Sequence, residues 1–157
     1  MRNQHNKDGL ELVFFQSAQQ LPTYWNEHLP ENHFLQKEQL AITEAAHLPN
    51  LSFYYVMVMK NNQMHSKHYF QLLRLNKQHL FNKEDGTLKK IVCNLILWTS
   101  KPSLLVSGHL FRHDICTFVK SPTISDFEAF QAYQFALQQV QKISGACATL
   151  IKDAPLY

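Results

Sequence analysis

The stretch LSFYYVMVMKNNQMHSKHYFQLLRL, residues 51–75, decides the fold, because it contains the clearest pair of strands in the sequence. Residues 51–60 are rich in aromatic and β-branched side chains, which favour extended strands. Asn61 and Asn62 follow, and asparagine tolerates the positive φ that a two-residue hairpin turn requires. A partner strand is predicted to run from there to about Leu75. The sequence therefore predicts a β-hairpin in the middle of the chain.

The segment before this hairpin predicts one further strand and two short helices. Residues 10–15, LELVFF, form an aliphatic and aromatic run that is typical of a strand. Pro22 suits the first turn of a helix, and Pro30 would end that helix. A second helix is predicted from Gln36 to His47. The inner face of the first helix would consist of Tyr24, Trp25 and Leu29.

The segment after the hairpin predicts a helix and three extended pieces. Residues 88–96 carry apolar side chains at helical spacing. The run SLLVSGH at 103–109 has the continuous apolar character of a strand that is buried on both faces. Residues 116–119 add a short extended piece, and residues 147–151 predict a final strand.

The last helix has the clearest start signal in the chain. The hydroxyl of Ser125 can accept a hydrogen bond from the amide three residues on, while Glu128 reaches back, which makes a capping box. Gly145 would end the helix, because glycine readily adopts the left-handed conformation that follows many helices. The buried face of this helix is predicted from Phe127, Phe130, Tyr133, Leu137 and Val140.

These elements follow the order β-α-α-β-β-α-β-α-β, which places the chain in the α/β (α+β) class. Local hairpins combined with a strand–helix–strand crossover imply a mixed central sheet with helices on both faces. The length of 157 residues suits one domain, and no internal repeat or linker divides residues 1–157.

The composition argues against several classes of protein. Apolar residues make up 45% of the chain and charged residues 17%, as in globular proteins. The net charge of +3 comes from scattered residues, so the sequence has no electrostatic footprint for nucleic acid. No apolar run approaches the ~18 residues of a membrane span, and the N-terminus lacks the apolar core of a secretory signal. Three cysteines without a CxxC motif predict reduced thiols in a cytoplasmic protein.

Polar residues at the ends of predicted strands are the candidates for chemistry. Gly108 ends a buried strand, where α/β proteins place ligands, but it is a weak candidate for cofactor binding, because a phosphate cradle uses several glycines. Lys152 and Asp153 follow the last strand and occupy the same kind of position. His109 and His113 lie four residues apart, but no third ligand is suggested, so no metal site is predicted.

The chain also resembles a known family over nearly its whole length. Residues 21–45, LPTYWNEHLPENHFLQKEQLAITEA, are similar to a pattern near the start of Fem-like proteins of the GNAT superfamily, which are peptidoglycan-biosynthesis or acyltransferase proteins. The segments FYYVMVMKNNQ, IVCNLILW, LLVSGH and TLIKD resemble later elements of the same family. The matching residues of the first segment are Trp25, Leu29, Pro30, Phe34, Leu35, Leu40 and Glu44.

The resemblance implies a GNAT-like sheet and the transfer of an acyl or aminoacyl group to an amine. The donor would be acyl-CoA or aminoacyl-tRNA, and the acceptor would be a small molecule or a peptidoglycan precursor. Such a reaction needs a base and a group that polarises the acyl carbonyl. The candidates for these roles are Gln71, which stands where the family commonly has glutamine, together with His109, Lys152 and Asp153.

Two departures from the family shape what is expected of this chain. His109 stands where the family has an asparagine after the glycine. Family members are more than twice as long and have two GNAT-like halves, so this chain resembles the N-terminal half and is expected to lack the C-terminal part of the fold. A transferase would then be incomplete or inactive alone. The alternative is a non-catalytic binding or assembly module whose open sheet edge pairs with a second GNAT-like half or another copy.

Overall fold

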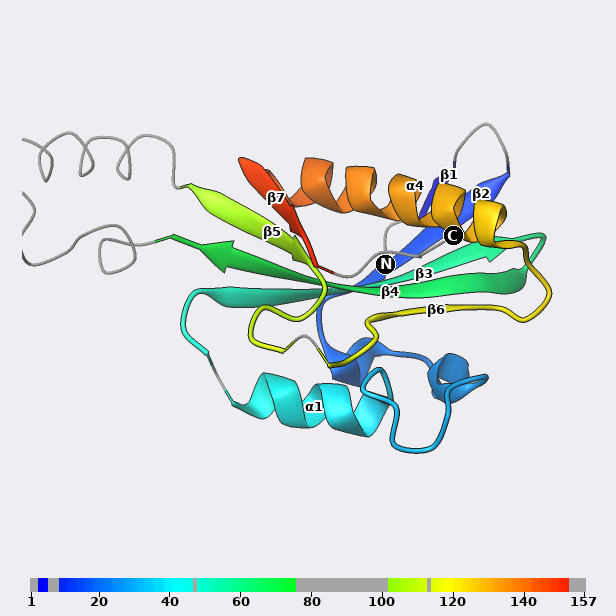
Figure 1. The fold of residues 1–157 in the computed structure, drawn as a ribbon, viewed down its shortest axis with the longest axis horizontal. Coiled ribbons are helices and arrows are strands. Elements are labelled where there is room, and N and C mark those ends of the chain that lie inside the picture. The colour runs from blue at the N-terminus through cyan, green and yellow to red at the C-terminus, as the bar shows by residue number, and fades with distance from the viewer. Residues whose placement is uncertain (1–2, 6–8, 47, 76–101, 113, 153–157) are drawn as a thin grey trace, which may run out of the picture.

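The computed structural model describes residues 3–5, 9–46, 48–75, 102–112 and 114–152. These residues form a mixed α+β fold around a mostly antiparallel sheet (Figure 1). The sheet order is β1-β2-β3-β4-β5-β7, and β6 also pairs with β4. Among the described strands, only β5 and β7 run parallel. The strands are β1 (Asn3–His5), β2 (Leu10–Phe15), β3 (Leu51–Lys60), β4 (Gln63–Arg74), β5 (Ser103–Ser107), β6 (Phe118–Lys120) and β7 (Ala148–Ile151).

The hairpin of β3 and β4 forms as its sequence predicts. The two strands pair antiparallel up to the turn, where Lys60 lies opposite Gln63. Asn61 and Asn62 have positive φ angles of 51° and 62°, which asparagine adopts more readily than most residues. β2 pairs with one side of the hairpin, while β5 and β6 pair with the other. The hairpin therefore lies at the centre of the sheet.

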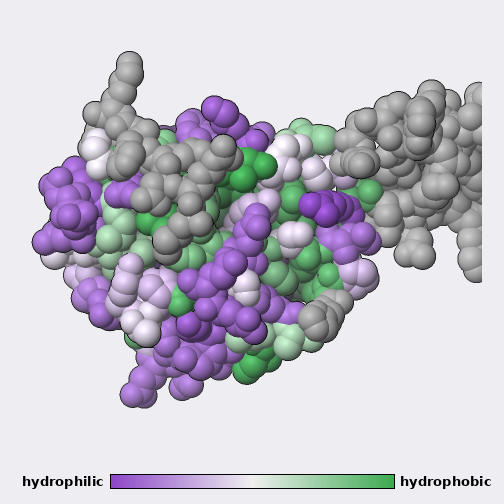
Figure 2. Space-filling model, turned by 180° about the vertical axis from the view of Figure 1, so that it is seen from behind, coloured by the Kyte–Doolittle hydropathy of each residue, from purple (hydrophilic) through white to green (hydrophobic). Residues whose placement is uncertain are grey.

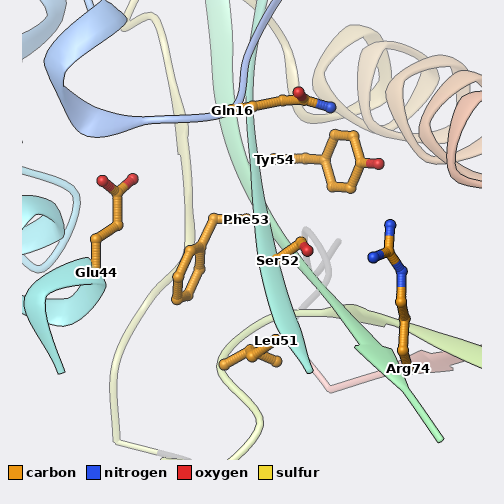
Figure 3. A pocket seen from close by; sticks show the side chains of 7 residues that line it. All are labelled: Gln16, Glu44, Leu51, Ser52, Phe53, Tyr54 and Arg74. Atoms are coloured by element: carbon orange, nitrogen blue, oxygen red, sulfur yellow. The ribbon is translucent and has the colours of Figure 1, made fainter. Parts of the chain in front are cut away.

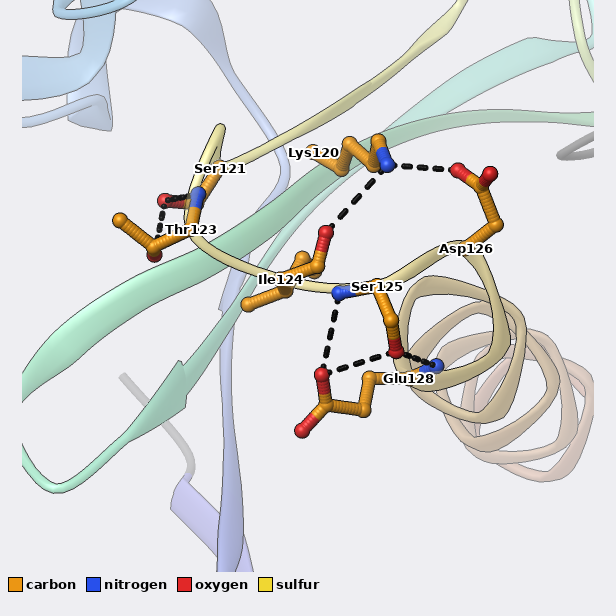
Figure 4. Close-up of polar contacts among 7 residues, drawn as sticks. All are labelled: Lys120, Ser121, Thr123, Ile124, Ser125, Asp126 and Glu128. Carbon is orange, nitrogen blue, oxygen red and sulfur yellow. Dashed lines mark hydrogen bonds and ion pairs between the residues drawn. The ribbon is translucent and has the colours of Figure 1, made fainter.

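The long helix α4 (Asp126–Ser144) begins and ends where the sequence predicts. The Ser125 hydroxyl accepts from the Glu128 amide at 3.2 Å, and the Glu128 carboxylate accepts from the Ser125 amide at 3.0 Å (Figure 4). Lys120 adds an ion pair of 2.5 Å to Asp126 in the first turn. Gly145 follows the helix with a φ of 66°. The predicted capping box and glycine cap are confirmed.

α4 covers one face of the sheet, and small residues allow the close contact (Figure 1). Tyr133 and Val140 are buried as predicted, and Phe130 and Leu137 pack at the margin. Phe127 is 64% exposed, so its predicted burial is wrong. It lies six residues before Tyr133, a rotation of about 120° around the helix, which turns it away from the sheet. The buried helix residues are Ala129, Ala132, Tyr133, Ala136 and Val140.

The opposite face of the sheet is covered by α1 (Lys37–Ala45) and the segment before it (Figure 1). The helix predicted from Gln36 to His47 is confirmed, with somewhat shorter bounds, and His47 lies outside the described residues. Helices on both faces of a mixed sheet are therefore confirmed. The helix predicted over residues 88–96 also lies outside the described part of the chain.

The predicted helix between Pro22 and Pro30 is wrong. The chain instead makes two short 3₁₀ helices, η1 (Ala18–Gln20) and η2 (Thr23–Asn26). The chain becomes extended after η2, and His28 has a positive φ of 63°, which an α-helix does not accommodate. The single turn is enough to place its tryptophan in the core.

Trp25 anchors this segment to the sheet. It is fully buried, and its indole N–H donates to the carbonyl oxygen of Leu35 at 2.7 Å. Its ring makes edge contacts with Phe15 and Tyr55, with centroids 6.2 and 6.3 Å apart. Tyr24, which was predicted beside it, is exposed. Of the three residues predicted for the inner face, Trp25 is therefore fully buried, and Leu29 packs against the same core while partly buried.

Candidate functional site

Three of the predicted site residues converge on the segment that follows β5, residues 108–112, here called the β5 loop. Gln71 approaches it from β4 and is fully buried. Its Oε1 accepts from the amide of Leu110 at 2.6 Å, and its Nε2 donates to the hydroxyl of Tyr69 at 2.7 Å. Both polar atoms of the side chain therefore have partners inside the protein. In this arrangement Gln71 positions the loop and does not face a substrate.

Lys152 approaches the β5 loop from the end of β7. Its ammonium donates to the carbonyl oxygens of His109 and Leu110, each at 2.7 Å, and to that of Arg112 at 3.3 Å. A lysine ammonium has three donors, so these contacts use all of them. Its backbone amide also donates to Ser107 at 2.9 Å. Lys152 therefore clamps the loop to the sheet. Asp153 lies outside the described residues.

His109 is the predicted site residue that retains chemical capacity. Its half-buried ring lies near those of Phe34 and Tyr69, with centroids 5.4 and 6.3 Å away. Nδ1 accepts from the amide of Phe111 at 3.2 Å, so in the neutral ring the proton is on Nε2. Burial, with the nearby Arg112 and Lys152 charges, lowers the pKa of His109. The imidazole is thus neutral at pH 7 and presents Nε2–H as a donor.

Gly108 gives the β5 loop its sharp start. It has a φ of 114°, which glycine adopts without a steric cost. Its amide lies 3.4 Å from the carbonyl oxygen of Tyr69 and donates to it. A phosphate would need several amides that point at it together, and this amide already has a partner. The geometry offers no phosphate cradle among the described residues of this loop.

The described residues contain neither a group of metal ligands nor a membrane-spanning helix. No three histidine, cysteine, aspartate or glutamate side chains of that part of the chain are grouped as a metal ion would require. His113, the predicted neighbour of His109, lies outside it. Neither described α-helix is long and apolar enough to cross a bilayer. Cys116 and Cys147 are exposed, and neither forms a disulfide with another described residue.

Two buried ionisable residues of β4 were not predicted. The ammonium of Lys67 lies 2.5 Å from the carbonyl oxygens of both Trp25 and Glu27, and burial lowers its pKa to about 8. His68 points toward α4, where its Nε2 is 2.8 Å from the hydroxyl of Ser66. Its Nδ1 has no partner among the described residues, and burial lowers its pKa to about 3. The sequence signal that could have located them is the presence of a charged residue, Lys67, and a polar residue, His68, inside a predicted strand.

A hollow of about 410 Å³ opens beside the start of β3. Figure 3 shows side chains from β3, β4 and α1 around this hollow. On one side of the molecule, hydrophilic residues surround smaller hydrophobic patches (Figure 2). The carboxylate of Glu44 is held there by the hydroxyl of Tyr55 at 2.6 Å and the amide of Ala18 at 2.7 Å. The lining residues are Gln16, Glu44, Leu51, Ser52, Phe53, Tyr54 and Arg74.

The outer edge of β7 is the second feature that the strand pairing creates. β7 is the last strand on its side of the sheet among the described residues. Leu150 and Ile151 are 41% and 54% exposed. The Lys152 amide donates to the Ser107 carbonyl oxygen at 2.9 Å, in the register that pairs Ile151 with Ser107, and backbone direction alternates along a strand. The backbone groups of Ala148 and Leu150 therefore face β5, and those of Thr149 and Ile151 face away from it.

Comparison with known proteins adds no relative. No protein family, curated protein or solved structure matches this chain significantly. The likeness to Fem-like transferases therefore rests on the sequence motifs alone.

Proposed function

We propose that this chain is a binding and assembly module, which pairs through the β7 edge of its sheet with a strand of a second chain. The observation that supports this most is the exposed apolar edge of β7, formed by Leu150 and Ile151 beside the outward backbone groups of Thr149 and Ile151. An edge strand with free amides and carbonyls is a template for another strand.

The sequence of β7 also lacks the features that block such pairing. Its four residues, Ala148–Ile151, contain no charge and no proline. Natural proteins protect exposed edges with lysine, proline or bulges, and none of these interrupts β7. The edge on the other side of the sheet is β1, which has only three residues, all of them polar. β7 is therefore the better surface for strand addition.

A second copy of the chain is the partner that can be tested directly. Two copies related by a two-fold axis would place their β7 strands antiparallel, which gives each outward amide a carbonyl partner. If the Fem-like resemblance holds, a second GNAT-like half would pair with the same β7 edge. Both partners use the same backbone groups, so changes to the edge affect either one.

Sedimentation velocity of the wild-type chain and of Leu150→Lys tests the proposal. We expect the wild type to form dimers at high concentration and Leu150→Lys to stay monomeric, because lysine on an edge strand opposes pairing. Ile42→Lys is the matched control, since Ile42 is 65% exposed on α1, away from the sheet edge. Dimers that persist in Leu150→Lys, or are lost equally in Ile42→Lys, would contradict the proposal.

A second candidate function is transfer of an acyl or aminoacyl group to an amine. It is favoured by one observation, the neutral imidazole of His109 on the β5 loop, where two parallel strands end. Its Nε2–H could polarise an acyl carbonyl, which is one of the two groups the reaction needs. The second group, a base, is not among the other described candidates, because Gln71 and Lys152 are engaged with the loop.

Calorimetric titration of acetyl-CoA into the chain tests the second function. A transferase that uses acyl-CoA should bind it, and His109→Ala should then lose acetyl transfer to a simple amine while the fold is kept. Absence of heat up to millimolar acetyl-CoA would reject an autonomous acyl-CoA enzyme. The assembly proposal does not depend on this result.

A further inference from the structure

The start of β3 has an open side, because the neighbouring strand ends early. β2 runs beside β3 only as far as the pair Phe15 and Tyr55. After Phe15 the chain leaves the sheet and enters η1. Residues 51–54 of β3 are therefore paired with β4 on one side only, and the hollow lies along their other side (Figure 3).

One residue of this open side presents both of its backbone groups to the hollow. The amide of Arg74 donates to the carbonyl of Asn50 at 2.9 Å, so the backbone of Asn50, and of every second residue after it, faces β4. The backbone of Phe53 therefore faces the position that β2 has left. None of the described residues hydrogen-bonds to the Phe53 amide or carbonyl. The edge thus has an unused donor and an unused acceptor.

The side chains around the hollow differ in what they offer a ligand. Arg74, Ser52 and Tyr54 extend to one side of the β3 edge, and Glu44 and Phe53 lie on the other (Figure 3). The guanidinium of Arg74 is exposed, and no acidic group of the described residues pairs with it. The carboxylate of Glu44, in contrast, already accepts from Tyr55 and Ala18. The charge available to a ligand is therefore positive.

The direction of the strands places this charge at a defined end of the hollow. A segment that continued the line of β2 would run antiparallel to β3, from the Gln16 end toward the Leu51 end. Arg74 lies at the Leu51 end, because its backbone pairs with that of Asn50. A peptide in this orientation would bring its C-terminal carboxylate toward the guanidinium. Ser52 of β3 lies between Arg74 and the open edge, and its small side chain leaves the arginine room to reach over the strand.

We propose that the hollow beside β3 binds a short extended peptide with a free C-terminal carboxylate, which adds to residues 51–54 as an antiparallel strand. Phe53 supplies the backbone hydrogen bonds, and Arg74 supplies the charge for the carboxylate. Four residues of open edge span about 13 Å, which sets the length of the bound segment at three or four residues. This strand addition uses a different edge from β7 and does not depend on the proposed function.

The test follows the amide signals of the chain by NMR while acetyl-Val-Thr-Val-Thr with a free carboxylate is added. We expect the Phe53 amide to shift in a saturable way. The amidated form of the same peptide should bind at least about fivefold more weakly, because it lacks the charge that pairs with arginine. Arg74→Gln should weaken binding of the carboxylate peptide by a similar factor and leave that of the amidated peptide unchanged.

Two controls separate strand addition from loose charge attraction. Lys142→Gln removes an exposed charge from the end of α4 and should not change the affinity. Peptides methylated on the backbone nitrogen of residue two or of residue three should differ, because only one of these nitrogens faces β3. Any one of three results would overturn the proposal. The two methylated peptides could bind with equal affinity, or Lys142→Gln could weaken binding as much as Arg74→Gln. The third is no shift of the Phe53 amide at 10 mM peptide, which is about a hundred times the Kd of a 100 µM ligand.

Discussion

The ammonium of Lys152 donates a hydrogen bond of 2.7 Å to the carbonyl oxygen of His109, although the two residues lie 43 positions apart in the sequence. This contact ties the end of β7 to the loop after β5. The same ammonium also donates to the carbonyl oxygens of Leu110 and Arg112, so one cation holds three carbonyl groups of the loop. A residue first considered for catalysis is thus assigned a structural role.

Replacing Lys152 with methionine should release the β5 loop. The carbonyl oxygens of His109 and Leu110 would lose their charged donor, and we expect a loss of about 1–3 kcal/mol in the free energy of unfolding. Hydrogen exchange of the Leu110 amide should become faster. Lys142→Met, on the exposed surface of α4, is the control. Unchanged exchange in the β5 loop of Lys152→Met would show that the clamp is not needed.

Gln71→Met keeps the volume of the side chain but removes both of its polar atoms. The amide of Leu110 and the hydroxyl of Tyr69 would then lack a partner in a buried site. Leaving buried polar groups unpaired costs about 1–3 kcal/mol each, so chemical denaturation should reveal a clear loss of stability. A change below about 0.5 kcal/mol, the usual range for neutral surface substitutions, would contradict the assigned role.

Lys67 should make the stability of the protein rise with pH above neutrality. Its pKa is lowered from 10.5 to about 8 in the folded chain, so between these values the unfolded chain binds more protons than the folded chain. The free energy of unfolding therefore increases with pH in this window, by up to about 1.4 kcal/mol per unit. Denaturation at pH 7.5, 8.5 and 9.5 should show this slope in the wild type and a smaller one in Lys67→Met.

His68 should make the protein sensitive to acid. Burial holds its pKa near 3, below the ordinary value of 6.5, so the unfolded chain binds the additional proton as the pH falls between them. Stability is therefore lost progressively below pH 6.5, by up to about 1.4 kcal/mol per unit from this residue. His68→Phe should therefore make the free energy of unfolding depend less on pH between about pH 6.5 and 4. Replacing the exposed His28 with glutamine should leave this pH dependence unchanged.

Local signals predicted much of this fold. The asparagine turn and the Ser125–Glu128 capping box depend on neighbouring residues, and both form as expected. The segment at Pro22 failed, because a proline and an apolar pattern suit a short 3₁₀ turn as well as an α-helix. Tertiary contact with the sheet fixes Trp25 in either case, so the sequence pattern alone does not distinguish the two.

The candidate site was harder to predict, because it depends on contacts between distant segments. The sequence located Gln71, His109 and Lys152 near strand ends, and the structure brings them together at the β5 loop. It did not reveal that two of the three are saturated by loop backbone groups. The hollow beside β3 depends on the residue at which β2 leaves the sheet, and no single motif encodes that point.

Hydrogen exchange along β7, measured over a range of protein concentrations, tests the central claim most directly. If the β7 edge pairs with a second copy, the outward amides of Thr149 and Ile151 gain protection as the concentration rises. The Leu150 amide, which faces β5, should be protected throughout and serves as the internal reference. Thr149 exchange that is equally fast at every concentration, while Leu150 stays protected, would contradict the claim that this edge is a pairing surface.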